Sequence, residues 1–249
     1  MPLPFDRAVV VIPTYCERES LPPLVERLLA AAPTVDVLVV DDNSPDGTGD
    51  LADEISRAEP RVHVLHRPGK QGLGPAYVAG FRWALDAGYD RIVEMDADGS
   101  HQPEQLPALL AGLDGGAALA IGSRWVPGGR VVNWPGYRRL ISRAGTQYAR
   151  LLLRSRLHDI TSGFRAFPRR TLETVDLASL SAHGYAFQIE LAWRVERSGA
   201  GISEVPITFI EREHGSSKMT FRIVFEALMR VTRWGFSREP EHPLVPAKQ

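Results

Sequence analysis

Residues 8–17 read AVVVIPTYCE, and this stretch decides the fold class of the chain. Its first five residues are apolar and mostly β-branched, and Pro13 ends the run, which predicts a strand buried on both faces. A second buried strand is predicted at 35–40, after a segment at 21–32 whose apolar residues recur at helical spacing. Strands that alternate with helices predict a parallel sheet covered by helices on both faces. We therefore expect an α/β fold with a Rossmann-like, mostly parallel sheet.

The alternation continues through the first half of the chain. Further strands are predicted at 62–65, 91–95 and 117–121, and further helices at 49–58, from the glycine-rich loop 69–74 through Leu85, and at 105–113. We expect one domain over residues 1–236. The tail, 237–249, carries Pro240, Pro243 and Pro246 and is expected to be disordered.

The composition sets limits on partners and compartment. The chain has 249 residues with a formal net charge of −1, so nothing in the overall charge favours nucleic acid as a partner. The single cysteine, Cys16, excludes an internal disulfide. The first six residues lack a basic leader and an apolar core, and no run of about 18 apolar residues occurs. The sequence predicts neither a signal peptide nor a transmembrane helix.

Acidic and aromatic residues follow three of the predicted strands. Tyr15 and Glu17 follow the first, Asp41 and Asp42 the second, and Asp96-Ala97-Asp98 the fourth. Ligands of parallel α/β sheets bind outside the carboxyl ends of the strands. Two carboxylates one residue apart repel each other unless a cation lies beside them, and a divalent cation there can hold a diphosphate. The pattern indicates a nucleotide-sugar transferase, with plain helix-capping loops as the alternative.

Basic residues occur at two further places. Arg124 follows the fifth strand, and its planar fork suits phosphate. Arg212 and the loop Gly215-Ser216-Ser217-Lys218 could fold over a diphosphate or simply be exposed. His101 and His214 form no ligand cluster, and we expect them to be hydrogen-bonding loop residues. The segment from Asp159 to Arg165 fits a functional loop or a tight turn equally well.

Two segments of the second half are apolar, basic and amphipathic. They are residues 137–157 and 220–236, where leucines, aromatic residues and arginines are interleaved. Helices of this kind lie well on an anionic membrane surface. The alternative is that they cover the sheet with their arginines facing water.

Several enzyme classes lack their motifs here. No G-x-G-x-x-G follows the first strand, no G-x-x-x-x-G-K-[ST] occurs, and no G-x-S-x-G elbow is present. A dinucleotide oxidoreductase, a P-loop enzyme and a serine hydrolase are therefore disfavoured. A non-catalytic sugar or nucleotide binder stays open, although it would not need a carboxylate pair.

Six motifs occur in one order that is similar to a known family. They are Pro13-Thr14-Tyr15-x-Glu17, the stretch 41–48 (DDNSPDGT), 95–98 (MDAD), 122–124 (GSR), 161–165 (TSGFR) and Gly215-x-Ser217-Lys218. Together they resemble the polyprenol-phosphate (dolichol-phosphate) mannose synthases, family 2 glycosyltransferases with the A-type fold. The resemblance runs from about Val9 to Phe236. It implies transfer of mannose from GDP-mannose to a polyprenyl phosphate, with inversion and with Mg²⁺ or Mn²⁺.

The resemblance also implies roles for individual residues. It places the guanosine at Pro13, Tyr15, Glu17, Val40 and Asp42, and the diphosphate and metal at Asp96, Ala97 and Asp98, with Asp98 the leading metal ligand. It assigns phosphate binding to Arg124, Arg212 and Lys218, and the acceptor phosphate to Arg124, Arg138, Arg139 and Ser142. Asp96, Asp98 and Arg124 are the catalytic candidates. Ser100 stands where some members have a metal-binding Gln.

The resemblance further implies a peripheral protein on the cytoplasmic face of the cell membrane. Its partners would be the membrane surface and, as an alternative anchor, a separate polytopic membrane protein. A phosphate acceptor is ionised near neutral pH, so we expect no dedicated general base, with Asp96 the candidate if one exists. The competing functions are a UDP-glucose-dependent polyprenyl-phosphate glucosyltransferase, a processive polysaccharide synthase, and an inactive subunit that steadies a membrane partner.

Overall fold

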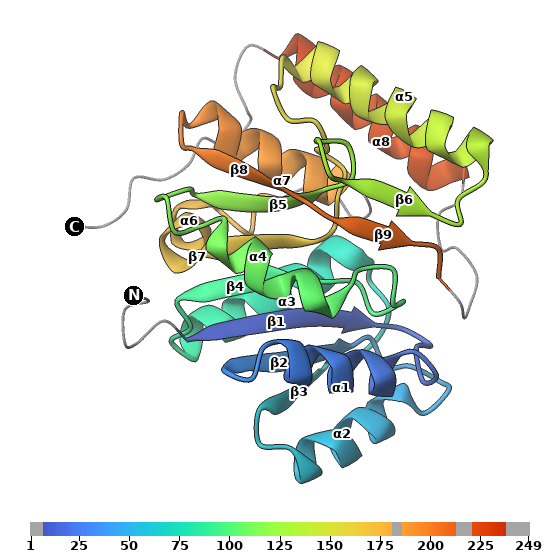
Figure 1. The fold of residues 1–249 in the computed structure, drawn as a ribbon, viewed down its shortest axis with the longest axis vertical. Helices are drawn as coiled ribbons and strands as arrows, with labels where there is room; N and C mark the ends of the chain where they lie inside the picture. Colours follow the sequence, from blue (N-terminus) through green and yellow to red (C-terminus); the bar gives the residue numbers. More distant parts are fainter. Residues whose placement is uncertain (1–6, 181–185, 213–220, 238–249) are drawn as a thin grey trace.

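The strands form the sheet that the alternating pattern predicts. A computed structural model describes residues 7–180, 186–212 and 221–237 (Figure 1). Among them, seven strands form one sheet in the order β3-β2-β1-β4-β7-β5-β8. The strands are β1 (Ala8–Thr14), β2 (Val35–Asp41), β3 (Val62–His66), β4 (Arg91–Glu94), β5 (Leu119–Ser123), β7 (Arg165–Pro168) and β8 (Ile202–Pro206). Only β7 runs antiparallel to its neighbours within this sheet, so the expectation of a mostly parallel sheet is confirmed.

The strand order reverses between β1 and β4. The chain builds outward from β1 to β2 and β3, then returns to place β4 on the other side of β1. In open α/β sheets this reversal leaves a crevice at the carboxyl ends of the two central strands. A smaller parallel pair, β6 (Arg130–Val132) and β9 (Thr208–Ile210), lies beyond the same end of β5 and β8.

The period-2 alternation of β1 divides the core into two layers. Val9 and Val11 join one cluster of buried residues, and Val10 and Ile12 join the other. Helices α1 (Leu21–Ala31) and α4 (Leu106–Ala111) pack on the second face, and α3 (Leu73–Asp86) and α7 (Ala186–Arg197) on the first. The other helices are α2 (Thr48–Ala58), the 3₁₀ turn η1 (Pro103–Gln105), α5 (Gly136–Leu153), α6 (Arg169–Thr174) and α8 (Phe221–Phe236).

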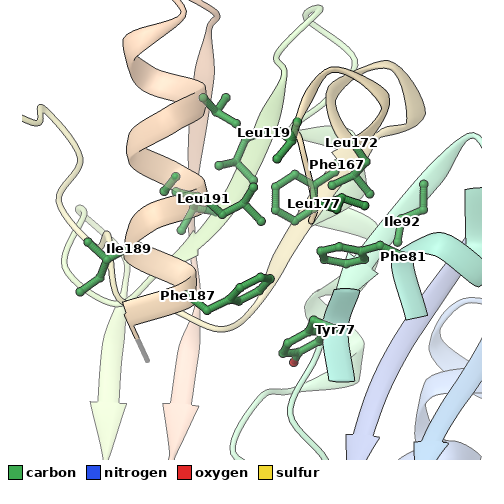
Figure 2. Close-up of a cluster of buried hydrophobic side chains, with 14 of the residues drawn as sticks. Tyr77, Phe81, Ile92, Leu119, Phe167, Leu172, Leu177, Phe187, Ile189 and Leu191 are labelled. Atoms are coloured by element: carbon green, nitrogen blue, oxygen red, sulfur yellow. The ribbon is translucent and has the colours of Figure 1, made fainter. Parts of the chain in front are cut away.

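Aromatic side chains fix α3 against the sheet and α7. The ring centroids of Phe81 and Phe167 lie 5.8 Å apart, and those of Tyr77 and Phe187 lie 6.0 Å apart (Figure 2). A Cβ atom at Gly80 would clash with Val11, so the glycine lets α3 approach β1 closely. The result is that Tyr77, one turn before Gly80, is held rigidly below the ends of the central strands.

Several predicted boundaries move. Helix α3 begins at Leu73, so Gly74 lies buried in its first turn rather than in the loop. The segment predicted as a helix at 105–113 divides into η1 and α4. Helix α5 ends at Leu153 instead of Leu157, because Arg154 adopts a left-handed conformation with φ of 55° and terminates it. Residues 238–249, most of the tail expected to be disordered, lie outside the described residues.

Helices α5 and α8 pack side by side at one end of the molecule (Figure 1). The hydroxyls of Tyr148 and Thr232 are 2.6 Å apart, and a Cβ at Gly235 would meet the carbonyl oxygen of Leu152 at 2.9 Å. All exposed large apolar side chains that the described residues present belong to these helices: Tyr137, Leu140, Ile141, Leu151, Phe225, Leu228, Met229 and Phe236. Neither these helices nor any other described one combines the length and apolarity needed to cross a membrane.

Candidate functional site

The loops that follow β1 and β2 are bonded to each other at the carboxyl edge of the sheet. The backbone N–H of Asp42 donates to the carbonyl of Thr14 at 3.1 Å, and that of Cys16 donates to the Ser44 hydroxyl at 3.1 Å. The Asp41 carboxylate links these loops, because it accepts hydrogen bonds from the Thr14 hydroxyl at 3.0 Å and from the Ser44 hydroxyl at 2.6 Å. Asp41 therefore takes part in a turn, whereas the alternative of helix capping by this segment is wrong for residues 41–44, because α2 has Gly47 at its N-cap and no side-chain cap.

Asp42 has a different environment. Its carboxylate accepts a hydrogen bond from the guanidinium of Arg67, and both side chains are more than nine-tenths buried. Burial raises the pKa of the Asp42 carboxyl, and the charge of Arg67 opposes that rise. Close by, the ammonium of Lys70 lies 4.0 Å from the ring centroid of Tyr15. Tyr15 and Asp42, two of the five residues expected at the guanosine, are thus both in contact with the loop that follows β3.

The acidic pair lies in the turn after β4. Asp96 accepts a hydrogen bond from the Tyr77 hydroxyl at 3.3 Å, and its pKa is raised to about 7, first by burial and then by the charge of Asp98. About a quarter of its side chain (28%) still faces solvent, so a ligand can reach it. Asp98 is paired with Arg212 at 3.0 Å and accepts from the backbone N–H of Ser100 at 3.0 Å. The basic residue predicted to neutralise the diphosphate therefore lies on the acidic pair.

The donor set fits a magnesium or manganese ion that shares its coordination with a substrate. In residues 7–180, 186–212 and 221–237, no three His, Cys, Asp or Glu side chains converge. Two neighbouring carboxylates, one with a raised pKa, nevertheless suit a hard divalent cation whose other ligands are phosphate oxygens and water. Ser100 is almost fully buried and takes no part in an accessible ligand set.

Arg124 is held by a buried carboxylate. Its Nε and one terminal nitrogen each donate to Asp159 at 2.7 Å, and its backbone N–H donates to the same carboxylate at 3.0 Å. Asp159 is in turn fixed by Glu204, which accepts from its backbone N–H at 2.9 Å. The fork that we expected to bind phosphate therefore faces Asp159, and the segment 159–165 is the loop that positions it.

Arg165 organises that loop from beneath. It is fully buried and donates to the carbonyls of Ile160 at 2.7 Å, Ser162 at 2.7 Å and Gln188 at 2.5 Å. Gly163 lies against Asp96, because a Cβ there would be 3.1 Å from the Asp96 carboxylate. The loop is thus both a tight turn and a wall of the site, which the sequence left undecided.

Three of the four residues expected to receive the acceptor phosphate lie on the first turns of α5, and the fourth, Arg124, follows β5. Arg138 is paired with Glu211, and its guanidinium lies 4.7 Å from the ring centroid of Trp134. Arg139 is exposed, and Ser142 is half-buried. Glu211 is followed directly by Arg212, so one dipeptide contacts both α5 and the acidic pair. The structure brings the expected donor and acceptor ends together at this point.

The expectation for His101 is wrong. Its ring is 1% exposed, lies between Phe164 and Phe209, and makes no hydrogen bond through either nitrogen among the described residues. Its Nε2 lies 3.7 Å from a carboxylate oxygen of Asp96. Burial lowers the pKa of His101 to about 4, so the ring is neutral at pH 7. The sequence gives no sign of this, because the burying rings come from distant parts of the chain.

The other expected residues divide into three groups. Pro13 lies within β1, which continues to Thr14 instead of ending at Pro13, and Tyr15 and Glu17 lie in the turn that follows. Glu17 accepts from the Ser20 hydroxyl at 2.9 Å. Val40 is fully buried with its side chain in the core, and Ala97 is 4% exposed. Lys218 and His214 lie outside the described residues. Sequence reasoning missed Arg67, Tyr77 and Asp159 as partners of site residues.

The chain is similar in sequence to known glycosyl transferases. The model of the family described as glycosyl transferase family 2 matches residues 9–176. The chain is 55% identical over 233 residues to a polyprenol monophosphomannose synthase of Mycolicibacterium smegmatis, covering 93% of this chain and 88% of that protein. It is 57% identical over 231 residues to an undecaprenyl-phosphate mannosyltransferase of Micrococcus luteus, covering 93% and 95%.

A solved structure has the same fold at much lower identity. Glucosyl-3-phosphoglycerate synthase from Mycobacterium tuberculosis, in complex with Mn²⁺, uridine-diphosphate-glucose and phosphoglyceric acid, superposes with a TM-score of 0.63. The two chains are 22% identical, and the match covers 92% of this chain and 80% of the other.

Proposed function

Because the chain belongs to glycosyl transferase family 2, we propose that it transfers mannose from GDP-mannose to a polyprenyl phosphate. The observation that carries the proposal is the Asp96–Asp98 pair at the strand reversal, faced by Arg212. The relatives that share more than half of the residues over nine-tenths of the chain are named for sugar transfer to polyprenol lipids or their phosphates. The names of these relatives support a polyprenyl phosphate acceptor, and the acidic pair with Arg212 supports a diphosphate donor.

The reaction needs one bond made and one broken. An oxygen of the acceptor phosphate forms a bond to the anomeric carbon of mannose, while the bond from that carbon to the β-phosphate oxygen breaks and GDP leaves with the electron pair. Attack from the side opposite the leaving group inverts the anomeric configuration. A phosphate monoester has a second pKa of about 6, so no proton has to be removed near neutral pH. Catalysis then depends on positioning and on charge at the leaving group.

We assign stabilisation of the leaving GDP to Asp98, Asp96 and Arg212. The two carboxylates would hold Mg²⁺ or Mn²⁺, which when bound stabilises negative charge on the diphosphate. The manganese in the related fold supports a divalent ion without deciding between the two metals. Arg212 is 15% exposed beside Asp98, so its guanidinium is placed to neutralise phosphate oxygens at the same point. Arg138 and Arg139 remain our candidates for the acceptor phosphate.

We propose that α5 and α8 rest on the cytoplasmic face of the cell membrane. Their outer surface presents Leu140 and Leu151, each 70% exposed, and Phe225, 65% exposed, among arginines. Such a surface suits the headgroup region of an anionic bilayer, where a polyprenyl acceptor resides. A separate polytopic membrane protein is the alternative occupant. Helix α8 also carries Glu226, which is neutralised by Arg230 at 2.9 Å.

Vesicle binding tests this placement. Changing Leu140 and Ile141 together to glutamate should abolish sedimentation with anionic phospholipid vesicles. Ala111→Glu, at an exposed position of α4 far along the chain from α5 and α8, is the control. Equal sedimentation of all three proteins would refute the lipid surface.

Transfer of labelled sugar to a short polyprenyl phosphate tests the function. GDP-mannose and UDP-glucose are compared with Mg²⁺, with Mn²⁺ and with EDTA. We expect metal-dependent product from GDP-mannose alone. Product from UDP-glucose alone would overturn the donor while leaving the reaction type, and no product from either, even with membranes added, would overturn the proposal.

A further inference from the structure

The buried ion pair between Asp42 and Arg67 has no evident structural purpose. The backbone N–H of Arg67 already donates to the Asp41 carbonyl at 2.8 Å, which fixes the start of the loop without the side chain. The side chains of Arg67 and Asp42 are only 8% and 7% exposed. Burying two charges commonly stabilises a fold no more than apolar residues of the same volume would. A pair of this kind at a ligand crevice therefore calls for a functional reason.

The loop that carries Arg67 is held by hydrogen bonds within itself and by contacts with Asp42 and Tyr15, two of the residues expected at the nucleotide base. A second nitrogen of Arg67 donates to the side-chain oxygen of Gln71 at 2.9 Å, and the backbone N–H of Gln71 donates to Asp42. Between them, Lys70 covers the ring of Tyr15. Arg67 is thus held by Asp42 on one side and by Gln71 on the other, which fixes the direction of its fork.

A carboxylate beside an arginine matches one nucleobase better than the others. Guanine offers two neighbouring donors, N1–H and the 2-amino group, and two neighbouring acceptors, O6 and N7. The carboxylate suits the donor pair and the guanidinium suits the acceptor pair, and the two meet at the O6 corner. Uracil has one N–H between two carbonyls, so the second carboxylate oxygen would face a carbonyl oxygen.

We propose that Arg67 is a specificity-determining residue that binds the O6 and N7 acceptors of guanine while Asp42 binds N1–H and the 2-amino group. The inference rests on the proposed function, since it concerns the base of the same donor. It assigns the choice of GDP over UDP to Asp42 together with Arg67, whose side chain on the loop after β3 reads the two acceptors that distinguish guanine on its other edge. Lys70 leaves the ring of Tyr15 when the base stacks there.

Equilibrium binding of nucleotide analogues tests the role atom by atom. Calorimetry with the full-length protein and fixed Mg²⁺ compares GDP, 7-deaza-GDP, IDP and UDP. 7-Deaza-GDP lacks only the N7 acceptor, and IDP lacks only the 2-amino group. The variants are Arg67→Gln and Arg67→Lys, the latter keeping the charge without the fork. Arg61→Gln is the matched control, because Arg61 is paired with Glu59 just before β3, at the opposite end of that strand from Arg67.

We expect the wild-type protein to bind GDP about tenfold more tightly than 7-deaza-GDP, the value of one good arginine–guanine contact. In both Arg67 variants GDP should weaken about tenfold more than 7-deaza-GDP, because the analogue has only its O6 contact to lose, so that the ratio of the two affinities falls toward one. The IDP penalty should persist in the variants, because Asp42 remains. Arg61→Gln should leave every ratio unchanged.

Two results would overturn the inference. If the variants weaken GDP and 7-deaza-GDP by the same factor, Arg67 merely holds Asp42, and if they change neither, the pair is unrelated to the base. A wild-type protein that prefers UDP to GDP would overturn the proposed donor instead. In either of the first two cases, a wild-type preference for GDP over UDP leaves the proposed function standing.

Discussion

Replacing Asp159 by asparagine should destabilise the protein far more than removing an exposed charge. The substitution keeps the shape of the side chain but leaves the Arg124 guanidinium, 8% exposed, without its counter-charge. Breaking one side of a buried ion pair costs about 3–5 kcal/mol. For a chain of this size each kcal/mol lowers Tm by about 2–4 °C. We therefore expect Asp159→Asn to lower Tm by about 6–20 °C.

Thermal unfolding at pH 7.5 measures this loss against a matched control. Arg169 and Glu173 form an exposed pair at 2.6 Å on α6, whose contribution should not exceed about 0.5 kcal/mol. Glu173→Gln should therefore move Tm by no more than about 2 °C. The double variant Arg124→Met with Asp159→Asn should lose less than the sum of the single variants. Equal shifts for Asp159→Asn and Glu173→Gln, or strict additivity, would refute the reasoning from burial.

Three further outcomes follow from other parts of the structure. Asp98→Asn should lower kcat for mannosyl transfer at least about 100-fold, and unchanged turnover would remove Asp98 from the site. The pKa of His101 is about 4 in the folded protein, so the unfolded chain takes up the proton first as the pH falls below about 6.5. The contribution of His101 to the free energy of unfolding should then fall by up to about 1.4 kcal/mol per pH unit between pH 6.5 and 4, while Asp96, with its raised pKa, acts in the opposite direction. Urea unfolding should therefore show that the stability of His101→Phe rises relative to that of the wild type as the pH falls through this range. Gly145→Ala on α5 adds a Cβ that meets nothing within 4 Å and should stabilise the protein by about 0.5–1 kcal/mol. Gly235→Ala brings a Cβ to 2.9 Å from the Leu152 carbonyl oxygen and should destabilise the protein. The reverse order of stability in urea unfolding would contradict the packing of α5 on α8.

The fold could be predicted because its signals are local. Each strand of the first half is a short apolar run, and each helix has an apolar face, so the alternation specifies the parallel order directly. The antiparallel strand β7 carries no such signal. Its residues Arg165 to Pro168 include a buried arginine, and only the gap between β4 and β5 requires a strand there.

Of the candidate site, the sequence could predict the carboxylates that follow the strands but not the residues that pair with them. Asp42 and Asp98 stand out because they follow strands, and the topology brings those strand ends together. Their partners Arg67 and Arg212 lie 25 and 114 residues further along the chain. Such pairings depend on the tertiary fold, and a single sequence does not contain them. Asp159 shows the same limit, since its role is decided by Arg124, which is 35 residues away.

Arg165 also orients the peptide groups of the loop beside the site. Its guanidinium draws the carbonyls of Ile160 and Ser162 inward. In a planar trans peptide the N–H points opposite to the carbonyl, so the N–H groups of Thr161 and Gly163 must point away from Arg165. Gly163 lies against Asp96, so the peptide between Ser162 and Gly163 has its direction fixed beside that carboxylate. A buried side chain that contacts no ligand thus determines how the backbone dipoles are oriented where negative charge collects.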